Sequence, residues 1–201
     1  MKVIGLCGGS GSGKGTVAEI FSVFGIPSVD TDRVYHELTS KKSECLDALV
    51  LEFGDGIICE DGSLDRKKLA DLVFGDGQAA IKRQRLNGIT HKFVLDRTRE
   101  MLSEFESLGA KAALVDAPLL FESGFDRECD VIIAVVADMD VRIERIMARD
   151  GISKNSATLR VKTQLPDDYL KSRADYVINN SGTLDTDEKA VCEVAKKILK
   201  N

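Results

Sequence analysis

The stretch Gly8-Gly9-Ser10-Gly11-Ser12-Gly13-Lys14-Gly15-Thr16 decides the fold of this 201-residue chain. It follows a short apolar run at residues 3–7 and opens a segment whose apolar residues recur at three- and four-residue steps, as in a helix. Glycines allow the main-chain N–H groups to turn inward and form an anion-binding nest at a helix start. Lys14 adds a positive charge that can bridge the β- and γ-phosphates of a nucleotide. The stretch therefore predicts a P-loop and a nucleotide site.

The residue after the lysine departs from the usual P-loop pattern, in which a Ser or Thr hydroxyl binds Mg²⁺. Gly15 stands there, and the hydroxyl of Thr16 comes one residue later. This form resembles adenylate-kinase-like P-loops, in which Mg²⁺ rests mostly on phosphates and water. We expect ATP and Mg²⁺ as cofactors, and no protein metal centre. The loop residues expected to bind the nucleotide are Gly9, Ser10, Gly11, Ser12, Gly13, Lys14, Gly15 and Thr16.

Outside this loop, apolar runs alternate with amphipathic helical stretches, a pattern typical of a parallel sheet covered on both faces. Strands are predicted at residues 3–7, 28–29, 112–115, 131–136 and 176–178. A closing helix is predicted because Val191, Val194, Ala195 and Ile198 share one helical face. The expected fold class is α/β: a three-layer P-loop NTPase fold with a five-stranded parallel sheet, in one domain over residues 1–201.

The pattern changes between residues 61 and 109, where no strand-like run occurs. Apolar residues at helical spacing predict one long amphipathic helix there: Val94, Met101, Leu102, Phe105 and Leu108. We interpret residues 61–109 as a helical acceptor-binding insertion over the carboxyl ends of the strands, where ligands of open α/β sheets bind. A polar segment rich in Arg and Lys predicts a mobile lid at about residues 142–165.

Composition narrows the function classes. The formal net charge is −5 and no long basic run occurs, which argues against a nucleic-acid partner. The five cysteines lack the short spacing of zinc or redox motifs, and free thiols are typical of a reducing cytosol. No apolar run is long enough to cross a membrane, and no leader segment is recognisable. We expect a cytoplasmic protein without a membrane partner; a homo-oligomer stays open.

Two carboxylates, in Asp30-Thr31-Asp32, lie where the second predicted strand meets its helix. A kinase that acts on an alcohol needs a carboxylate within hydrogen-bond reach of the hydroxyl, to orient it and take its proton. Asp32 is our candidate for this role. Either aspartate could instead be the N-cap of the following helix, and spacing does not separate the two roles. Asp116, at the end of the third predicted strand, is a weaker candidate to support the water shell of Mg²⁺.

Several separated pieces, in their order and spacing, resemble the dephospho-coenzyme A kinase family over nearly the whole chain. The similar pieces are residues 5–14, Val29-Asp30-Thr31-Asp32 with His36, Phe53-Gly54, residues 61–66, Leu86-Asn87-Gly88-Ile89-Thr90-His91, Pro118-Leu119-Leu120-Phe121-Glu122, Arg145, Arg149-Asp150-Gly151, Arg160, Gln164 and residues 174–182. Two departures concern the acceptor contacts. Lys92 follows His91 where the family usually has Pro, and the Pro-Gly often found after the Asp-x-Asp helix is missing.

The resemblance implies ATP-dependent phosphorylation of the ribose 3′-hydroxyl of dephospho-CoA, which yields CoA and ADP in the final step of coenzyme A biosynthesis. The partners implied are therefore dephospho-CoA and ATP. The catalytic residues implied are Lys14, Asp32 and Arg149, with Arg145 and Asn179 as further nucleotide contacts. The acceptor contacts implied are Asp32, His36, His91, Pro118, Leu119 and Glu122.

Each of these roles has an alternative. Arg145 and Arg149 are four residues apart and share a helix face, so they could also form a solvated basic face paired with acidic neighbours. His91 could be a half-buried structural histidine, and Glu122 could cap a short helix. Two other functions stay open: a nucleoside or nucleoside-monophosphate kinase, because of the Gly-Lys-Gly-Thr loop, and a non-catalytic nucleotide-gated regulatory protein, because of the incomplete Mg²⁺ ligand set.

Overall fold

Five parallel strands form one sheet in the computed structural model, which describes residues 1–75, 78–182 and 184–200. The strand order is β2-β3-β1-β4-β5. Their bounds are β1 Lys2–Cys7, β2 Ser28–Asp30, β3 Ala112–Asp116, β4 Val131–Val136 and β5 Tyr176–Asn179. The predicted five-stranded parallel sheet is confirmed; β4 has the predicted bounds, and each other strand is one residue longer.

The register of the sheet brings the ends of three strands to one edge. Leu6 of β1 and Asp30 of β2 both lie opposite Asp116 of β3. Because the strands are parallel, their carboxyl ends finish at the same side of the sheet. The chain leaves β1 at Cys7 and enters the glycine-rich loop directly. The P-loop and the carboxylates of Asp30 and Asp116 are therefore neighbours in the fold.

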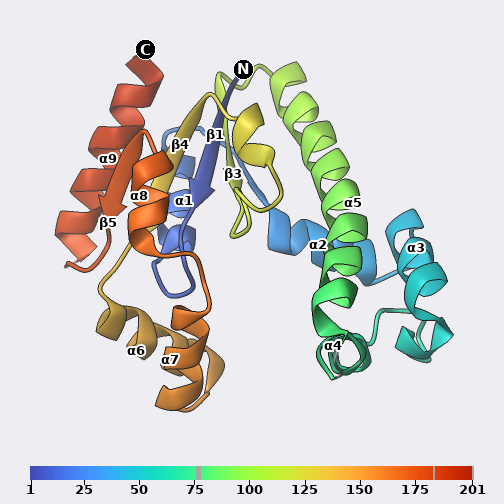
Figure 1. Cartoon of the computed structure of the whole chain (residues 1–201). Coiled ribbons are helices and arrows are strands. Elements are labelled where there is room, and N and C mark those ends of the chain that lie inside the picture. Colours follow the sequence, from blue (N-terminus) through green and yellow to red (C-terminus); the bar gives the residue numbers. More distant parts are fainter. Residues whose placement is uncertain (76–77, 183, 201) are drawn as a thin grey trace. The chain divides into compact units, whose positions relative to one another are not determined.

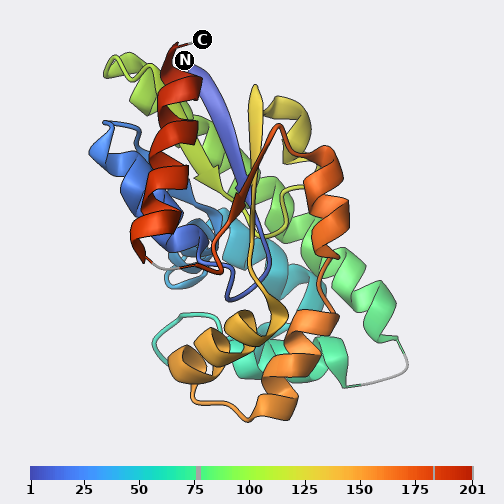
Figure 2. The ribbon, with the colours of Figure 1, turned by 90° about the vertical axis from the view of Figure 1, so that its left-hand side faces the viewer.

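Helices cover both faces of the sheet. The elements outside the strands here are α1 Lys14–Val23, η2 Phe125–Glu128, α6 Met139–Asp150, α7 Lys154–Lys162, α8 Asp167–Arg173 and α9 Leu184–Lys200. On one face, Val17 and Phe21 of α1 and Ala195 of α9 join one buried cluster with Ile4 and Leu114 of the sheet. Figure 1 shows α9 beside β5, and Figure 2 shows the sheet between α9 and α8. The predicted apolar face of α9 is confirmed, since Val191, Val194, Ala195 and Ile198 are all buried.

The chain divides into two compact units. The first, Met1–Asp30 with Leu102–Asn201, contains the sheet and is called the sheet unit below. The second, Thr31–Met101, is called the helical unit. Its elements are α2 Thr31–Thr39, α3 Glu44–Phe53, η1 Asp55–Ile57, α4 Arg66–Phe74 and most of α5 Ala79–Ser107. No helix in the described part of the chain is both long and apolar enough to cross a membrane.

The helical unit has its own apolar core. Its buried members are Cys45, Leu46, Leu49, Ile57, Leu64, Leu69 and Val73. Two of its helices begin with the side-chain caps that their sequences favour: Ser43 accepts from the N–H of Leu46, and Asp65 accepts from the N–H of Lys68. The hydrogen bond from Lys68 is also the main reason that the pKa of Asp65 lies below its usual value. Local signals thus specify where α3 and α4 start.

The end of α5 differs from the prediction. Val94 and Leu102 are buried as expected, but α5 ends at Ser107 and Leu108 is 84% exposed. Hydrogen bonds from Gly109 N–H to the Glu106 carbonyl and from Ala110 N–H to the Phe105 carbonyl close the helix, with Gly109 at φ 84°. This is a Schellman-type ending, which turns the chain out of the helical path. The assignment of Leu108 to the apolar face was therefore wrong.

Candidate active site

The glycine-rich loop has the geometry of an anion-binding nest. Gly11 (φ 79°) and Gly13 (φ 91°) adopt the left-handed backbone conformation that favours glycine. The N–H of Ser12 donates to the Gly9 carbonyl at 3.1 Å, which closes the turn. Gly13 is the N-cap of α1 and has no side chain to satisfy the first-turn amides. These amides remain available to an anion at the positive end of the helix.

Lys14 is held at the carboxyl edge of the sheet. Its Nζ donates to the Gly8 carbonyl at 3.0 Å and lies 3.9 Å from Oδ1 of Asp116. Only 12% of the lysine side chain is exposed. Burial raises the pKa of the neighbouring Cys7 thiol to about 12, although the charge of Lys14 opposes this shift. Cys7 is therefore uncharged at neutral pH, and its thiol does not compete with an anion for Lys14.

The hydroxyls of the loop differ in environment. The Oγ of Ser12 is buried and has no hydrogen-bond partner among the described residues. A buried hydroxyl without a partner costs about 1–3 kcal/mol, so a phosphate oxygen at this place would be stabilising. Gly15 and Thr16 are exposed. Residues 1–75, 78–182 and 184–200 contain no group of three or more His, Cys, Asp or Glu side chains that could hold a metal ion.

Asn180, directly after β5, supports the loop. Its Nδ2 donates to the Ser12 carbonyl at 2.7 Å, and the side chain is almost fully buried. An added Cβ on Gly13 would lie only 1.9 Å from this nitrogen, so the close approach requires glycine. The predicted nucleotide contact Asn179 ends β5, where its Oδ1 accepts from the N–H and the hydroxyl of Ser181, and its contact with a nucleotide stays a prediction. The sequence analysis singled out Asn179 and missed the contact made by Asn180.

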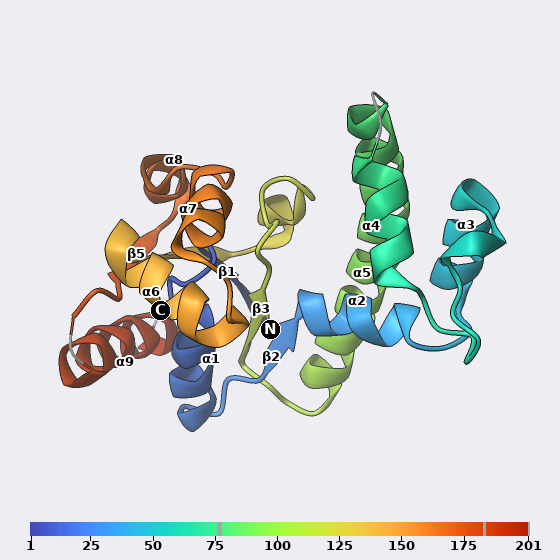
Figure 3. The ribbon, with the colours of Figure 1, turned by 90° about the horizontal axis from the view of Figure 1, so that it is seen from below.

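Three arginines of α6 contact the loop. Arg145 Nη1 donates to the Gly11 carbonyl at 3.3 Å, and Arg149 Nη2 donates to Oγ of Ser10 at 3.3 Å. Arg142 Nε donates to the Ser10 carbonyl at 3.0 Å. Figure 3, which looks toward the carboxyl ends of the strands, shows α6 and α7 in front of this edge. Arg142 was missed, although its spacing of three and seven residues from Arg145 and Arg149 puts all three on one helix face.

Arg149 also takes part in a charge cluster on α6 and α7. Its Nε lies 2.7 Å from Oδ1 of Asp150, and Arg160 donates to the other carboxylate oxygen. The hydrogen bond from Arg149 is the largest reason that the pKa of Asp150 falls to about 2. The pairing with Asp150 that was left open as an alternative is therefore present, and Arg149 reaches the P-loop as well.

A pocket of about 270 Å³ lies beside the first glycines of the loop. It is lined by Gly8, Gly9, Pro118, Leu119, Glu122, Thr163, Gln164, Leu165, Pro166 and Leu170. The sequence predictions Pro118, Leu119 and Glu122 thus come together with the P-loop. The short helix η2 has Gly124 as its N-cap, so Glu122 does not cap it. The walls are mostly apolar, and Glu122 supplies the one acidic group of the lining.

The remaining candidates belong to the helical unit. Asp32 lies exposed in the first turn of α2, directly after Asp30 and Thr31. His36 is exposed on the same helix and is hydrogen-bonded through Nδ1 to Arg66, whose guanidinium lies 5.8 Å from the centroid of the Tyr35 ring. His91 is half-buried in α5.

The Nε2 of His91 has no hydrogen-bond partner within the described ranges. Burial lowers the pKa of His91, so its ring is neutral at physiological pH. A neutral ring with an unused nitrogen can donate or accept one hydrogen bond, depending on its tautomer. The structure therefore leaves His91 chemically able to bind a polar group.

Comparisons with known proteins identify the family to which this chain belongs. A model of the family described as dephospho-CoA kinase matches residues 2–186. A curated dephospho-CoA kinase from Syntrophotalea carbinolica is 37% identical over 199 residues, which cover 99% of this chain and 93% of that protein.

Solved structures show the same fold. The crystal structure of TT1252 from Thermus thermophilus has a TM-score of 0.78 and 32% identity, with 98% of this chain and 97% of that one covered. The dephospho-CoA kinase from Campylobacter jejuni has a TM-score of 0.73 and 24% identity, with 100% of this chain and 98% of that one covered. At this identity the comparison shows a shared fold. The fold is that of P-loop kinases, and the chain is a kinase that belongs to the dephospho-CoA kinase family.

Proposed function

We propose that this chain transfers the γ-phosphoryl group of ATP to the ribose 3′-hydroxyl of dephospho-CoA, with CoA and ADP as products. One observation carries the proposal: in a chain of this family, Lys14 is held 3.0 Å from the Gly8 carbonyl at the mouth of a glycine nest. A buried ammonium beside main-chain amides is suited to stabilise the charge that develops on a transferring phosphoryl group.

The sheet unit binds the nucleotide in this proposal. The amides of residues 9–16 surround the phosphates, and Lys14 contacts the β- and γ-phosphates. Arg145 and Arg149 already contact the loop and lie where they add positive charge when ATP is bound. Asn180, rather than Asn179, maintains the loop against β5.

Mg²⁺ accompanies the triphosphate. The residues that would hold it, directly or through water, are Asp116, whose carboxylate lies beside Lys14, and the exposed Thr16. This donor set fits an ion that keeps most of its bonds to phosphate and water, as Mg²⁺ commonly does. When bound, the ion neutralises negative charge on the phosphates.

The acceptor binds with its uncharged end in the pocket beside Gly8 and Gly9. The apolar walls formed by Pro118 and Leu119 suit the flat base and the sugar, and the Glu122 carboxylate can accept from a hydroxyl or an amino group. His36 and His91 are acceptor contacts from the helical unit in this proposal. Their neutral or hydrogen-bonded rings suit polar groups of the acceptor.

Asp32 orients the 3′-hydroxyl and takes its proton. The hydroxyl oxygen forms a bond to the γ-phosphorus while the bond to the β–γ bridging oxygen breaks, and ADP leaves. The proton passes to the Asp32 carboxylate and then to solvent. No covalent intermediate on the enzyme is needed, because positioning and charge stabilisation supply the catalysis.

The proposed location is the cytoplasm. The five cysteines of the chain are free. Thiols of this kind persist in a reducing compartment.

ADP release, measured with ATP and Mg²⁺ in the presence and absence of dephospho-CoA, tests the function. Dephospho-CoA should stimulate ADP release, and the product should co-elute with CoA. AMP and adenosine, supplied at equal concentration, should be poor acceptors. Faster turnover of AMP or adenosine, or release that is independent of any acceptor, would falsify the proposal.

A further inference from the structure

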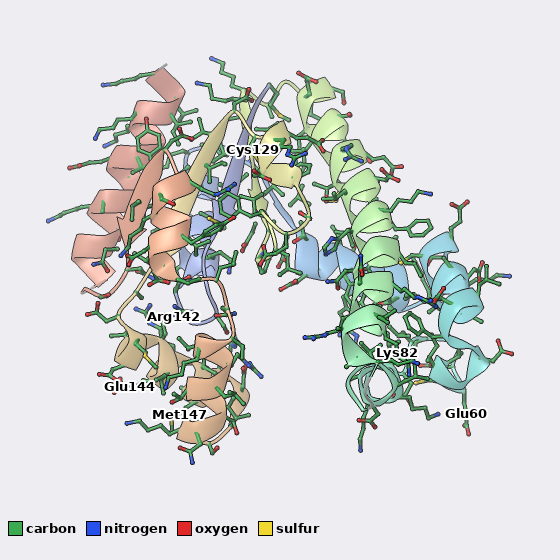
Figure 4. All side chains as sticks on the ribbon, in the orientation of Figure 1. Glu60, Lys82, Cys129, Arg142, Glu144 and Met147 are labelled. Atoms are coloured by element: carbon green, nitrogen blue, oxygen red, sulfur yellow. The ribbon has the colours of Figure 1, made fainter. Side chains whose placement is uncertain are left out.

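We propose that Arg142 is a positioning residue that fixes the entry turn of the P-loop and ties it to the wall of the neighbouring pocket. Arg142 is 4% exposed and lies on α6, as Figure 4 shows. The inference rests on the proposed function, because it concerns the ATP site, but it assigns a role to a residue that the sequence did not reveal.

The guanidinium of Arg142 has three partners. Its Nε donates to the Ser10 carbonyl at 3.0 Å, its Nη2 to Oε1 of Gln164 at 2.8 Å and its Nη1 to Oδ1 of Asp167 at 3.1 Å. These acceptors are a loop carbonyl, a lid amide and a carboxylate at the start of α8. The planar guanidinium can satisfy three acceptors at fixed directions, which the ammonium of a lysine cannot reproduce.

Both main-chain polar groups of Ser10 are held through this arrangement. The Ser10 N–H donates to Oε1 of Gln164 at 2.9 Å, and the Ser10 carbonyl accepts from Arg142. Oε1 of Gln164 therefore accepts from Ser10 and from Arg142 and closes a ring of three hydrogen bonds. The ring sets the two peptide planes that flank Ser10, and with them the direction of the amides that follow. Amides already oriented before ATP arrives need no reorganisation.

The charge of Arg142 is balanced within the same group. A buried guanidinium without a partner would be strongly destabilising. Asp167, whose side chain is 27% exposed, supplies the opposite charge at 3.1 Å. Because Asp167 follows Pro166 and Gln164, both of which line the pocket, the ion pair also fixes one wall of that pocket. Arg142 thus connects the ATP loop with the proposed acceptor pocket.

The lack of space for a side chain at Gly9 independently supports this role of Arg142. A Cβ added to Gly9 would lie 1.9 Å from Nη2 of Arg142 and 2.9 Å from Oε1 of Gln164. Gly9 does not have a positive φ, so its backbone conformation would accept alanine. What requires glycine at this position is the space taken by the guanidinium. An alanine there would displace Arg142 and break the ring.

ATP affinity of the folded protein, measured by calorimetry without acceptor, tests the inference. Arg142→Ala should weaken ATP binding about tenfold, as expected for the loss of hydrogen bonds to a charged group. Arg142→Lys should weaken it to a similar extent. A lysine keeps the positive charge but cannot donate hydrogen bonds in the three directions that the guanidinium uses. Gln164→Ala should weaken binding less. The control Glu144→Ala, an exposed residue of the same helix, should bind ATP as the original protein does.

Two double variants separate positioning from simple stability. The double variants Arg142→Ala/Gln164→Ala and Arg142→Ala/Gly9→Ala should bind ATP about as weakly as Arg142→Ala alone, because the changes open the same ring and their losses do not multiply. Circular dichroism and the melting temperature establish that each variant is folded. If Arg142→Ala fails to fold, Gly9→Ala and Gln164→Ala with their double variant carry the test.

The inference is overturned if Arg142→Ala lowers the melting temperature and leaves ATP affinity unchanged. It is equally overturned if the losses in the double variants multiply. Failure of the proposed function is a different outcome, since it would appear as normal ATP binding by the original protein without transfer to dephospho-CoA.

Discussion

The sheet unit and the helical unit present their candidate groups in different ways. In the sheet unit, the proposed phosphate site consists largely of main-chain groups in residues 8–16, and Arg142 and Asn180 support them from elements far along the chain. In the helical unit, the candidates Asp32, His36 and His91 are side chains on helices. Main-chain amides bind any phosphate, whereas side chains can distinguish one acceptor from another.

The apolar cores of the two units also differ, in how far apart along the chain their residues lie. The main core of the sheet unit joins Ile4, Leu114, Ile133 and Val191, which are separated by most of the chain. The core of the helical unit joins residues from one continuous segment. Contacts between distant residues fold the sheet unit cooperatively, while the helical unit depends on local helix packing. The following predictions test this division, from the largest expected effect to the smallest.

Lys14→Ala should have the largest effect. Loss of the ammonium beside Gly8 and Asp116 removes the main positive charge at the transferring group. The specificity constant for ATP should fall about 10³-fold, a loss of about 4 kcal/mol. Steady-state kinetics at saturating acceptor measure it, and Lys171→Ala in exposed α8 is the control. Unchanged kinetics would contradict the assignment of the phosphate site to the sheet unit.

Leu49→Ala should destabilise the helical unit by about 3 kcal/mol, as deletion of a fully buried leucine commonly does. Urea unfolding measures the loss. ATP affinity of the folded protein should remain, because the groups proposed to bind ATP lie in the sheet unit. The matched control is Leu51→Ala, since Leu51 is exposed on the same helix. A large loss of ATP affinity would show that the two units do not divide the work in this way.

Asp32→Asn should lower kcat about 10²-fold, the lower end of what a general base contributes. ATP affinity should not change, because the amide retains the shape of the side chain and the phosphate site is elsewhere. Kinetics and calorimetry together measure the two effects. Glu37→Gln, on the exposed part of α2, serves as the control. A larger loss in Asp30→Asn than in Asp32→Asn would transfer the role to the neighbouring carboxylate.

The smallest effect concerns the buried thiol of the sheet unit. Burial raises the pKa of Cys7 to about 12, above its ordinary value of 9.0. The unfolded chain releases this proton first, so the stability linked to the thiol is complete below pH 9 and decreases as pH rises toward 12. At pH 10 the decrease is about 1 kcal/mol. Urea unfolding from pH 8 to pH 10 should show a shallower pH slope for Cys7→Ala; an identical slope would contradict the prediction.

Local sequence signals predicted much of the fold. The five strands and the closing helix followed from apolar runs and helical spacing, because each such element has to bury one stripe or face. The P-loop followed from a motif whose residues are adjacent in the chain. The end of α5 could not be predicted from the spacing of apolar residues, because Leu108 continues that spacing while Gly109 ends the helix.

The site was predicted only where its residues carry a local pattern. Lys14 was found from the glycine-rich motif, and Pro118, Leu119 and Glu122 were implied by the resemblance of their segment to the family; the structure brings them to the same edge. Arg142 shares a helix face with Arg145 and Arg149, but neither Arg142 nor Asn180 has a local pattern that indicates a carbonyl 132 or 168 residues away as its partner. A single sequence contains no signal for a hydrogen bond of that separation.

By itself, then, the sequence determined the elements: strand, glycine loop with its lysine, and helix, since each depends on residues within one turn or one strand. Only the tertiary structure decided which distant side chains hold that loop in shape. A guanidinium on α6 and an amide after β5 can act on Ser10 and Ser12 only after the sheet has formed and brought these chain segments together.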